Sequence, residues 1–142
     1  MEWASLWILF DMGQRRILRP SSLPVVLPEF GDQGVRVEPR KVDLPGGWGD
    51  RSSSYVHTVR CCEVDPNMHM NSSIYGDLVD NALFSVVDGG GVNWSRVQIN
   101  YLAEARLGDE VDVKCCRGED GGFFVGGVSK GRTVFAALVE TA

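Results

Sequence analysis

The residues of this chain that could do chemistry gather in one short segment. Positions 65–72, DPNMHMNS, hold a carboxylate, two amides, a hydroxyl and one of the two histidines. Histidine side chains in general titrate near neutrality, so His69 could polarise or protonate a substrate. Asp65 could act as base or nucleophile, and Asn67 could orient the histidine or hold a water. The alternative is structural, because Asp65 and Asn71 could cap a helix or close an Asx-turn, and a histidine by itself is usually a structural residue.

The elements around this segment predict an α+β fold. Residues 55–64 are rich in β-formers and indicate a strand. Ile74, Leu78, Ala82 and Val86 recur every four residues, which predicts an amphipathic helix over residues 73–87 that ends at the glycines 89–91. Four more strands are expected at residues 94–103, 110–116, 122–129 and 133–141. We therefore expect a meandering antiparallel sheet of about five strands wrapped around one central helix.

The first third of the chain reads differently. Residues 2–18 indicate one strand, with a turn or bulge at 12–14. Residues 20–51 contain five of the six prolines and sustain no period, which favours a linker. Residues 1–19 would then be the end of a preceding domain that the chain does not contain.

Composition narrows the function classes. The net charge is −5, and residues 61–142 carry six Lys or Arg against twelve Asp or Glu, which argues against nucleic-acid binding. The apolar residues 1–10 are too few to cross a bilayer, so no membrane association is expected. The cysteines form two adjacent pairs, 61–62 and 115–116, which cannot chelate as a CxxC motif does. We expect one core and one exposed cysteine in each pair, reduced in a cytoplasmic protein.

The central motif resembles the acyl-ACP thioesterase family of fatty-acid synthesis. That family carries D-x-N-x-H-V-N-N before the central helix of a hotdog fold, and Asp65, Asn67, His69 and Asn71 match it, whereas Ser72 departs from the second Asn. Residues 99–110, INYLAEARLGDE, are similar to the family's strand with an acidic residue, here Glu104, followed by a Gly-Asp turn. Residues 7–20 are similar to the last strand of the family's first hotdog repeat.

This resemblance implies both a domain plan and a site. The family has two tandem hotdog repeats, with the active site in the second, so residues 1–19 would be a remnant, 20–51 a linker and 52–142 the thioesterase domain. The catalytic positions would be Asp65, Asn67, His69 and Glu104, and the helix start would bind the oxyanion through the amides of Asn71, Ser72 and Ser73. Ala105 stands where plant members have a cysteine, which excludes a cysteine nucleophile at that position.

The leading hypothesis is hydrolysis of fatty acyl-ACP to free fatty acid, without metal or cofactor. Acyl carrier protein would be bound partly through the basic cluster of Arg15, Arg16 and Arg19. An acyl-CoA thioesterase and a hotdog enoyl hydratase are the enzyme alternatives, although the N-x-H spacing favours the thioesterase. A non-catalytic acyl-binding subunit or an inactive fragment is the remaining alternative. We also expect a homo-oligomer or pairing with a second hotdog repeat, because sheet edges would otherwise stay open.

Overall fold

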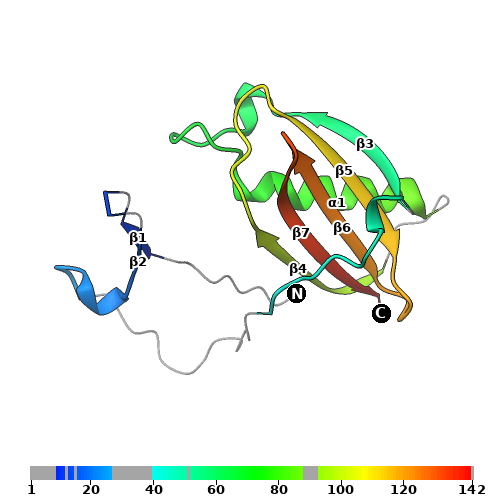
Figure 1. Ribbon diagram of the computed structural model, residues 1–142, viewed down its shortest axis with the longest axis horizontal. Coiled ribbons are helices and arrows are strands. Elements are labelled where there is room, and N and C mark those ends of the chain that lie inside the picture. The colour runs from blue at the N-terminus through cyan, green and yellow to red at the C-terminus, as the bar shows by residue number, and fades with distance from the viewer. Residues whose placement is uncertain are drawn as a thin grey trace. The chain divides into compact units, whose positions relative to one another are not determined.

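The computed structural model describes residues 9–11, 13–14, 16–26, 40–50, 52–87 and 93–141. The chain divides into two compact units, Met1–Arg40 and Lys41–Ala142. In the first unit, β1 (Leu9–Asp11) pairs antiparallel with β2 (Arg16–Leu18), and a 3-10 turn, η1 (Pro20–Ser22), follows (Figure 1). The prediction of one continuous strand over residues 2–18 is therefore wrong in the described part, whereas the turn predicted at residues 12–14 is confirmed at residues 13–14. Residues 1–8 lie outside the described part.

A side chain explains why the predicted strand folds back into a hairpin. Asp11 Oδ1 accepts the amides of Gly13 and Gln14 at 2.8 and 2.9 Å. An Asp side chain closes a local turn when it accepts hydrogen bonds from the backbone amides two and three residues later in the chain. The polar residues between the apolar runs therefore reverse the chain and pair the runs with each other.

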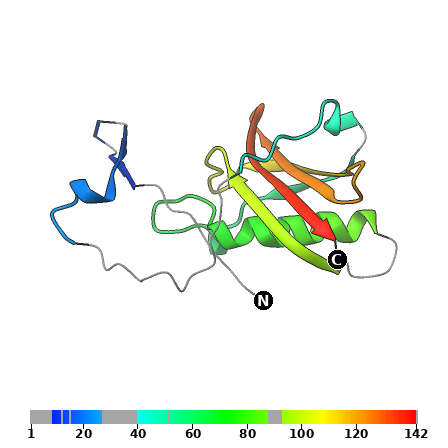
Figure 2. The ribbon, with the colours of Figure 1, turned by 90° about the horizontal axis from the view of Figure 1, so that it is seen from below.

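The second unit is one helix against a five-stranded antiparallel sheet, as predicted (Figures 1 and 2). The sheet curves around α1 (Ser72–Val86), which crosses one of its faces. Two short 3-10 helices, η2 (Trp48–Asp50) and η3 (Cys61–Glu63), precede and follow the first strand of this sheet. In chain order the strands are β3 (Ser53–Thr58), β4 (Trp94–Tyr101), β5 (Glu110–Arg117), β6 (Phe123–Ser129) and β7 (Arg132–Thr141).

The strand order is β3-β5-β6-β7-β4, so the sheet is not a simple meander. Strands β5, β6 and β7 follow one another as hairpins, but β4 pairs with β7 at the far edge and β3 takes the place beside β5. The chain leaves β4 where the amides of Leu102 and Ala103 both donate to Val134 O. Residues 102–109 then connect β4, at one edge of the sheet, to β5, which lies next to the opposite edge. This connection contains Glu104, the predicted acidic residue.

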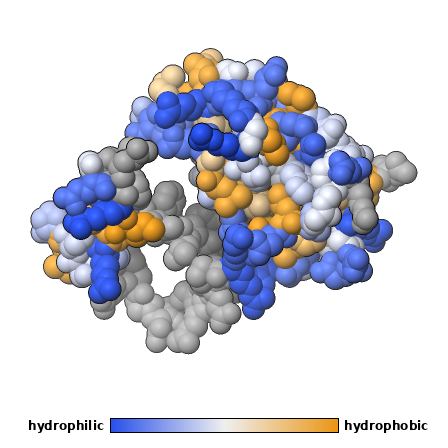
Figure 3. Space-filling model, viewed as in Figure 1, coloured by the Kyte–Doolittle hydropathy of each residue, from blue (hydrophilic) through white to orange (hydrophobic). Residues whose placement is uncertain are grey.

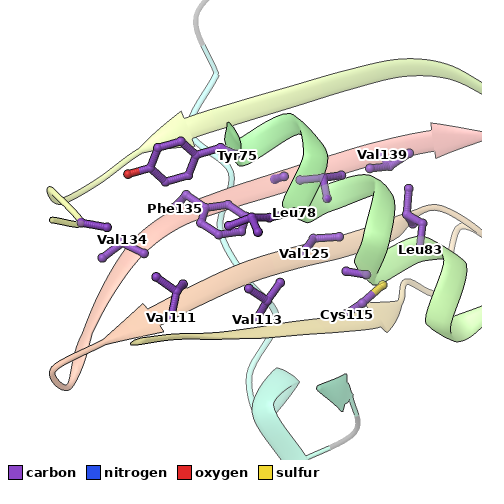
Figure 4. Close-up of a cluster of buried hydrophobic side chains, with 14 of the residues drawn as sticks. Tyr75, Leu78, Leu83, Val111, Val113, Cys115, Val125, Val134, Phe135 and Val139 are labelled. Atoms are coloured by element: carbon purple, nitrogen blue, oxygen red, sulfur yellow. The ribbon is translucent and has the colours of Figure 1, made fainter. Parts of the chain in front are cut away.

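The core lies between α1 and the sheet (Figure 4). The buried helix residues recur every three or four positions, and the alternating residues Val111, Val113 and Cys115 of β5 face them in a row. The buried helix residues are Tyr75, Leu78, Val79, Ala82 and Leu83. The periodicities read from the sequence therefore identify the two faces that meet.

The cysteine prediction is wrong for both pairs. Cys61 and Cys62 lie in η3 rather than in a strand, and both are exposed. Cys115 and Cys116 point to opposite faces of β5, and both are buried. The reason is that α1 packs on one face of β5 while η2 contacts the strand as well.

Residues 41–50, predicted as part of the linker, pack on the second unit as a covering segment over the outer face of the sheet (Figure 1). The Val42 amide donates to Asn100 Oδ1 of β4, and Val42 is 6% exposed. Leu44 and Trp48 approach β6 so closely that a Cβ on Gly126 would lie 2.9 and 2.8 Å from them. This segment thus covers part of the outer face of the sheet, opposite α1 (Figure 2).

The surface of the second unit mixes polar and apolar patches on the face that Figure 3 shows. Large apolar side chains are nevertheless exposed near the central motif, namely Met68, Tyr101, Leu102 and Leu107. Among the described residues, no helix is long and apolar enough to cross a membrane.

The tightest glycine in the core gives a stability prediction. A Cβ on Gly127 would meet the Phe135 ring and lie 2.8 Å from Val111 Cγ1, so Gly127→Ala should lower the free energy of unfolding by about 1–3 kcal/mol through overpacking. Gly76→Ala is the matched control, because a Cβ there meets nothing within 4 Å and helix propensity should raise stability by roughly 0.5–1 kcal/mol. Urea unfolding of both variants checks this, and equal effects would contradict the packing argument.

Candidate active site

Asp65 closes the loop that carries His69. Its Oδ1 accepts the amides of Asn67 at 2.8 Å and of His69 at 3.1 Å, while its own amide donates to His69 O at 2.8 Å. These bonds, the one from His69 foremost, lower the pKa of Asp65. The Asx-turn predicted for Asp65 therefore describes its hydrogen bonds. These bonds fix the backbone of His69 and so the position from which its imidazole extends.

Asn71 ends the loop as the N-cap of α1. Its Oδ1 accepts both the amide and the hydroxyl of Ser73 at 3.1 Å. The Asn71 amide donates to Glu63 O. The cap therefore occupies the Ser73 amide. The amide of Ser72, also in the first turn, is not used by the cap and could bind a ligand.

The loop pairs with the segment that carries Glu104. His69 and Arg106 form an isolated antiparallel bridge, and the Met70 amide donates to Ala105 O at 2.8 Å. Side chains alternate along such a pair, so Met70 and Ala105 are buried, whereas His69, Glu104 and Arg106 share the other side.

Glu104 binds two cationic or polar neighbours through one oxygen. His69 Nε2 lies 3.2 Å from Glu104 Oε2, and Arg106 Nη2 lies 3.0 Å from the same atom. The Glu104 side chain is 55% exposed and that of His69 28%, so a substrate can reach both. The structure thus brings together two of the four residues predicted as catalytic.

The sequence reasoning did not single out Arg106. The available signal was its spacing, because a residue two positions after Glu104 in an extended segment lies on the same side.

The other predicted residues lie apart from this pair. Asn67 is exposed, and its amide side chain hydrogen-bonds Asp65 rather than His69 or Glu104 in the part of the chain described. Arg16 and Arg19 are exposed in the first unit, and Arg15 lies outside the described residues. The second histidine, His57, lies 2.9 Å from Glu63 Oε2, and both side chains are largely buried, in keeping with its predicted structural role.

Two tyrosines that the motif did not predict lie beside the pair. The Tyr75 ring meets Tyr101 and Phe135 edge to face, with centroids 5.1 and 5.3 Å apart, and its phenol is hydrogen-bonded by the Ala105 backbone. Burial raises the pKa of Tyr75, so the phenol keeps its proton at neutral pH. The Tyr101 hydroxyl donates to Ser72 O at 3.3 Å, which links β4 to the helix start.

The Gly-Asp turn anchors the backbone of the acidic segment. Asp109 Oδ2 accepts the Arg106 amide at 3.2 Å, and the Asp109 amide donates to Arg106 O at 2.9 Å. Gly108 has φ +80°, a conformation that favours glycine. Lys130 Nζ lies 2.6 Å from Asp109 Oδ1 and, with the Arg106 amide, lowers the pKa of Asp109.

The arrangement offers acid–base chemistry without a thiol. Ala105 occupies the position after Glu104 and is buried. Burial, reinforced by neighbouring Cys116, raises the pKa of Cys115 to about 12, so that thiol stays protonated at neutral pH. No three His, Cys, Asp or Glu of the described residues are grouped to hold a metal ion. The groups at hand are a carboxylate, an imidazole and helix-start amides.

Comparison with known proteins identifies the family and the fold of the chain. The family model of the acyl-ACP thioesterase C-terminal domain matches residues 49–130, more than half of the chain. An acyl-ACP thioesterase from Bacteroides thetaiotaomicron superposes with a TM-score of 0.69 at 19% identity, over 94% of this chain and 53% of that one. The chain therefore spans about half the length of that protein.

Smaller proteins share the fold as well. A hypothetical protein from Staphylococcus aureus, solved in complex with CoA, superposes with a TM-score of 0.58 at 20% identity, over 64% of this chain and 74% of its own. A hypothetical thioesterase from Streptococcus pneumoniae gives 0.54 at 21% identity, over 63% of this chain and 80% of its own. A search of curated proteins found no match. These likenesses confirm the predicted hotdog fold.

The Asp109 contacts give a pH prediction. Because its folded pKa is depressed, Asp109 stabilises the fold above its ordinary pKa of 3.8, and this contribution disappears as the pH falls through the lower folded value. Asp109→Asn should therefore lower the free energy of unfolding at pH 7, by up to about 1 kcal/mol, and the difference from wild type should shrink below pH 3.8. Urea unfolding across pH measures it. Asp43→Asn should change little, because both side chains of the Lys41–Asp43 pair are largely exposed. A pH-independent effect of Asp109→Asn would refute the assignment.

Proposed function

The chain belongs to the acyl-ACP thioesterase C-terminal domain family, and from this premise we propose that it hydrolyses fatty acyl-ACP to release the free fatty acid. The family match and the topology identify a thioesterase-family domain with the hotdog fold. The observation that carries the proposal is the contact of His69 Nε2 with Glu104 Oε2 at 3.2 Å, between residues far apart in the chain.

In the proposed reaction Glu104 is the general base. It takes a proton from water, and the resulting hydroxide oxygen bonds to the thioester carbonyl carbon. The C–S bond then breaks, and the leaving thiolate takes a proton from His69 in its imidazolium form, which leaves a neutral imidazole. The proton held by Glu104 then passes to this imidazole and restores both groups. The products are a carboxylic acid and the carrier thiol, so atoms and protons balance.

The remaining motif residues have supporting roles in this proposal. In this proposal the Ser72 amide, at the positive end of α1, stabilises the oxyanion, whereas Asn71 and Ser73 form the helix cap next to it. Asp65 holds the His69 backbone, and Asn67 stays with Asp65.

Acyl carrier protein is the proposed partner. Carriers are acidic, and Arg16 and Arg19 present exposed cations in the first unit. An acyl-CoA thioesterase uses the same reaction on the same carbonyl, so substrate comparison distinguishes the two. A hotdog enoyl hydratase would instead add water to a double bond and leave the thioester intact.

A second hotdog unit is the proposed structural partner. Strands β3 and β4 are the sheet edges of the described second unit, and four large apolar side chains are exposed near the site, namely Met68, Tyr101, Leu102 and Leu107. If residues 1–19 belong to another hotdog repeat and residues 52–142 are the catalytic repeat, that other repeat or a second copy of the chain would cover these groups.

This second proposal predicts self-association. Light scattering of the purified chain should give a dimer or larger assembly, because the exposed edge strands and apolar side chains find a partner only in another copy. A monodisperse monomer at micromolar concentration would refute it.

The activity prediction uses the full chain with acyl-ACP and acyl-CoA. Glu104→Ala and His69→Ala should each lower kcat/KM by about 100-fold or more, because each removes a proton-transfer group. Glu140→Ala is the matched control, since Glu140 is a similarly exposed carboxylate, paired with Arg96, and should keep full activity. Free fatty acid release measures the reaction. Equal rates for wild type and both site variants would overturn the proposed function, and a preference for acyl-CoA would overturn the carrier assignment.

A further inference from the structure

The geometry points to Arg106 as a positioning residue that fixes the Glu104 carboxylate for reaction. This inference rests on the proposed function, in which Glu104 is the base. It adds a residue that the motif did not include.

Arg106 and His69 bind the same oxygen of Glu104. Arg106 Nη2 lies 3.0 Å and His69 Nε2 3.2 Å from Oε2. A carboxylate without partners turns freely about its terminal bond, whereas one that accepts a hydrogen bond from Arg106 and contacts His69 at the same oxygen is restricted in its orientation. Oε1 is the oxygen that neither residue engages, so it is the one presented to the attacking water.

The backbone of Arg106 is fixed by several hydrogen bonds, although its side chain is exposed. It pairs with His69 in the antiparallel bridge, and Asp109 binds its amide and its carbonyl oxygen. Asp109 is in turn paired with Lys130 on the β6–β7 hairpin. The backbone position of Arg106 is therefore fixed, and its side chain lies on the same side of the segment as that of Glu104.

The Arg106 side chain has no structural task that explains this placement. It is 63% exposed, so removing it takes little out of the core, and an exposed ion pair contributes little to stability. An effect of Arg106 on the reaction would therefore come through Glu104. If Arg106 instead bound an anionic part of the substrate, its loss would raise KM and leave kcat unchanged.

The test compares Arg106→Met and Arg106→Lys with wild type. Arg106→Met should lower kcat about tenfold, because a misplaced base reacts more slowly, with KM and the thermal midpoint unchanged. Arg106→Lys should recover part of the rate, since a cation remains beside Oε2. Arg96→Met is the matched control, because Arg96 forms a comparable surface pair with Glu140 and should leave kcat unchanged.

A double-mutant cycle separates positioning from other roles. In a Glu104→Gln background, Arg106→Met should lower kcat no further, because the carboxylate that it positions is gone. An undiminished tenfold loss in that background, a rise in KM alone, or a lowered thermal midpoint would each overturn the inference. If Glu104→Ala is inactive while Arg106→Met is fully active, only the positioning role fails. If Glu104→Ala is as active as wild type, the proposed function itself fails.

Discussion

The pairing of residues 69–70 with residues 105–106 is the contact on which the site depends. It joins two segments that are far apart in the chain through the His69–Arg106 bridge and the Met70–Ala105 hydrogen bond. Met70 and Ala105 enter the core from one side of this pair, at 5% and 0% exposure. Because neighbouring residues point to opposite sides, the burial of Met70 and Ala105 holds His69 and Glu104 in contact on the other side.

The same alternation explains why a small apolar residue, Ala105, follows Glu104. The side chain that follows Glu104 points into the core in this conformation, where only a small apolar group is present. Ala105 is therefore a packing residue beside the Tyr75 phenol, which takes a hydrogen bond from its backbone. Chemistry on this face of the domain falls to groups on the Glu104 side, namely a carboxylate, an imidazole and a guanidinium.

The sequence predicts the features that local rules determine. The helix follows from the spacing of Ile74, Leu78 and Ala82, and the N-cap follows from Asn71 before it. The meeting of His69 with Glu104 was predicted by the resemblance, because local periodicity says nothing of contacts across the chain.

Features that depend on tertiary packing were missed. The burial of Cys116 and the packing of residues 41–50 on the sheet depend on which segment covers which face. The contact of Arg106 with Glu104 depends on a side-chain conformation that spacing permits but does not require.

The two carboxylates of the motif looked equivalent in sequence, and their hydrogen bonds distinguish them. Asp65 accepts two backbone amides, which stabilise its charged form and lower its pKa, so it is a weak base. A proton on the other oxygen, Oδ2, would make Oδ1 a weaker acceptor for these two amides, and weaker bonds would loosen the loop that holds His69. In the described part of the chain, the Glu104 carboxylate contacts the side chains of His69 and Arg106 through Oε2 and supports no backbone amide. A carboxylate that changes protonation during a reaction must not support the local backbone, and of the two only Glu104 meets this condition.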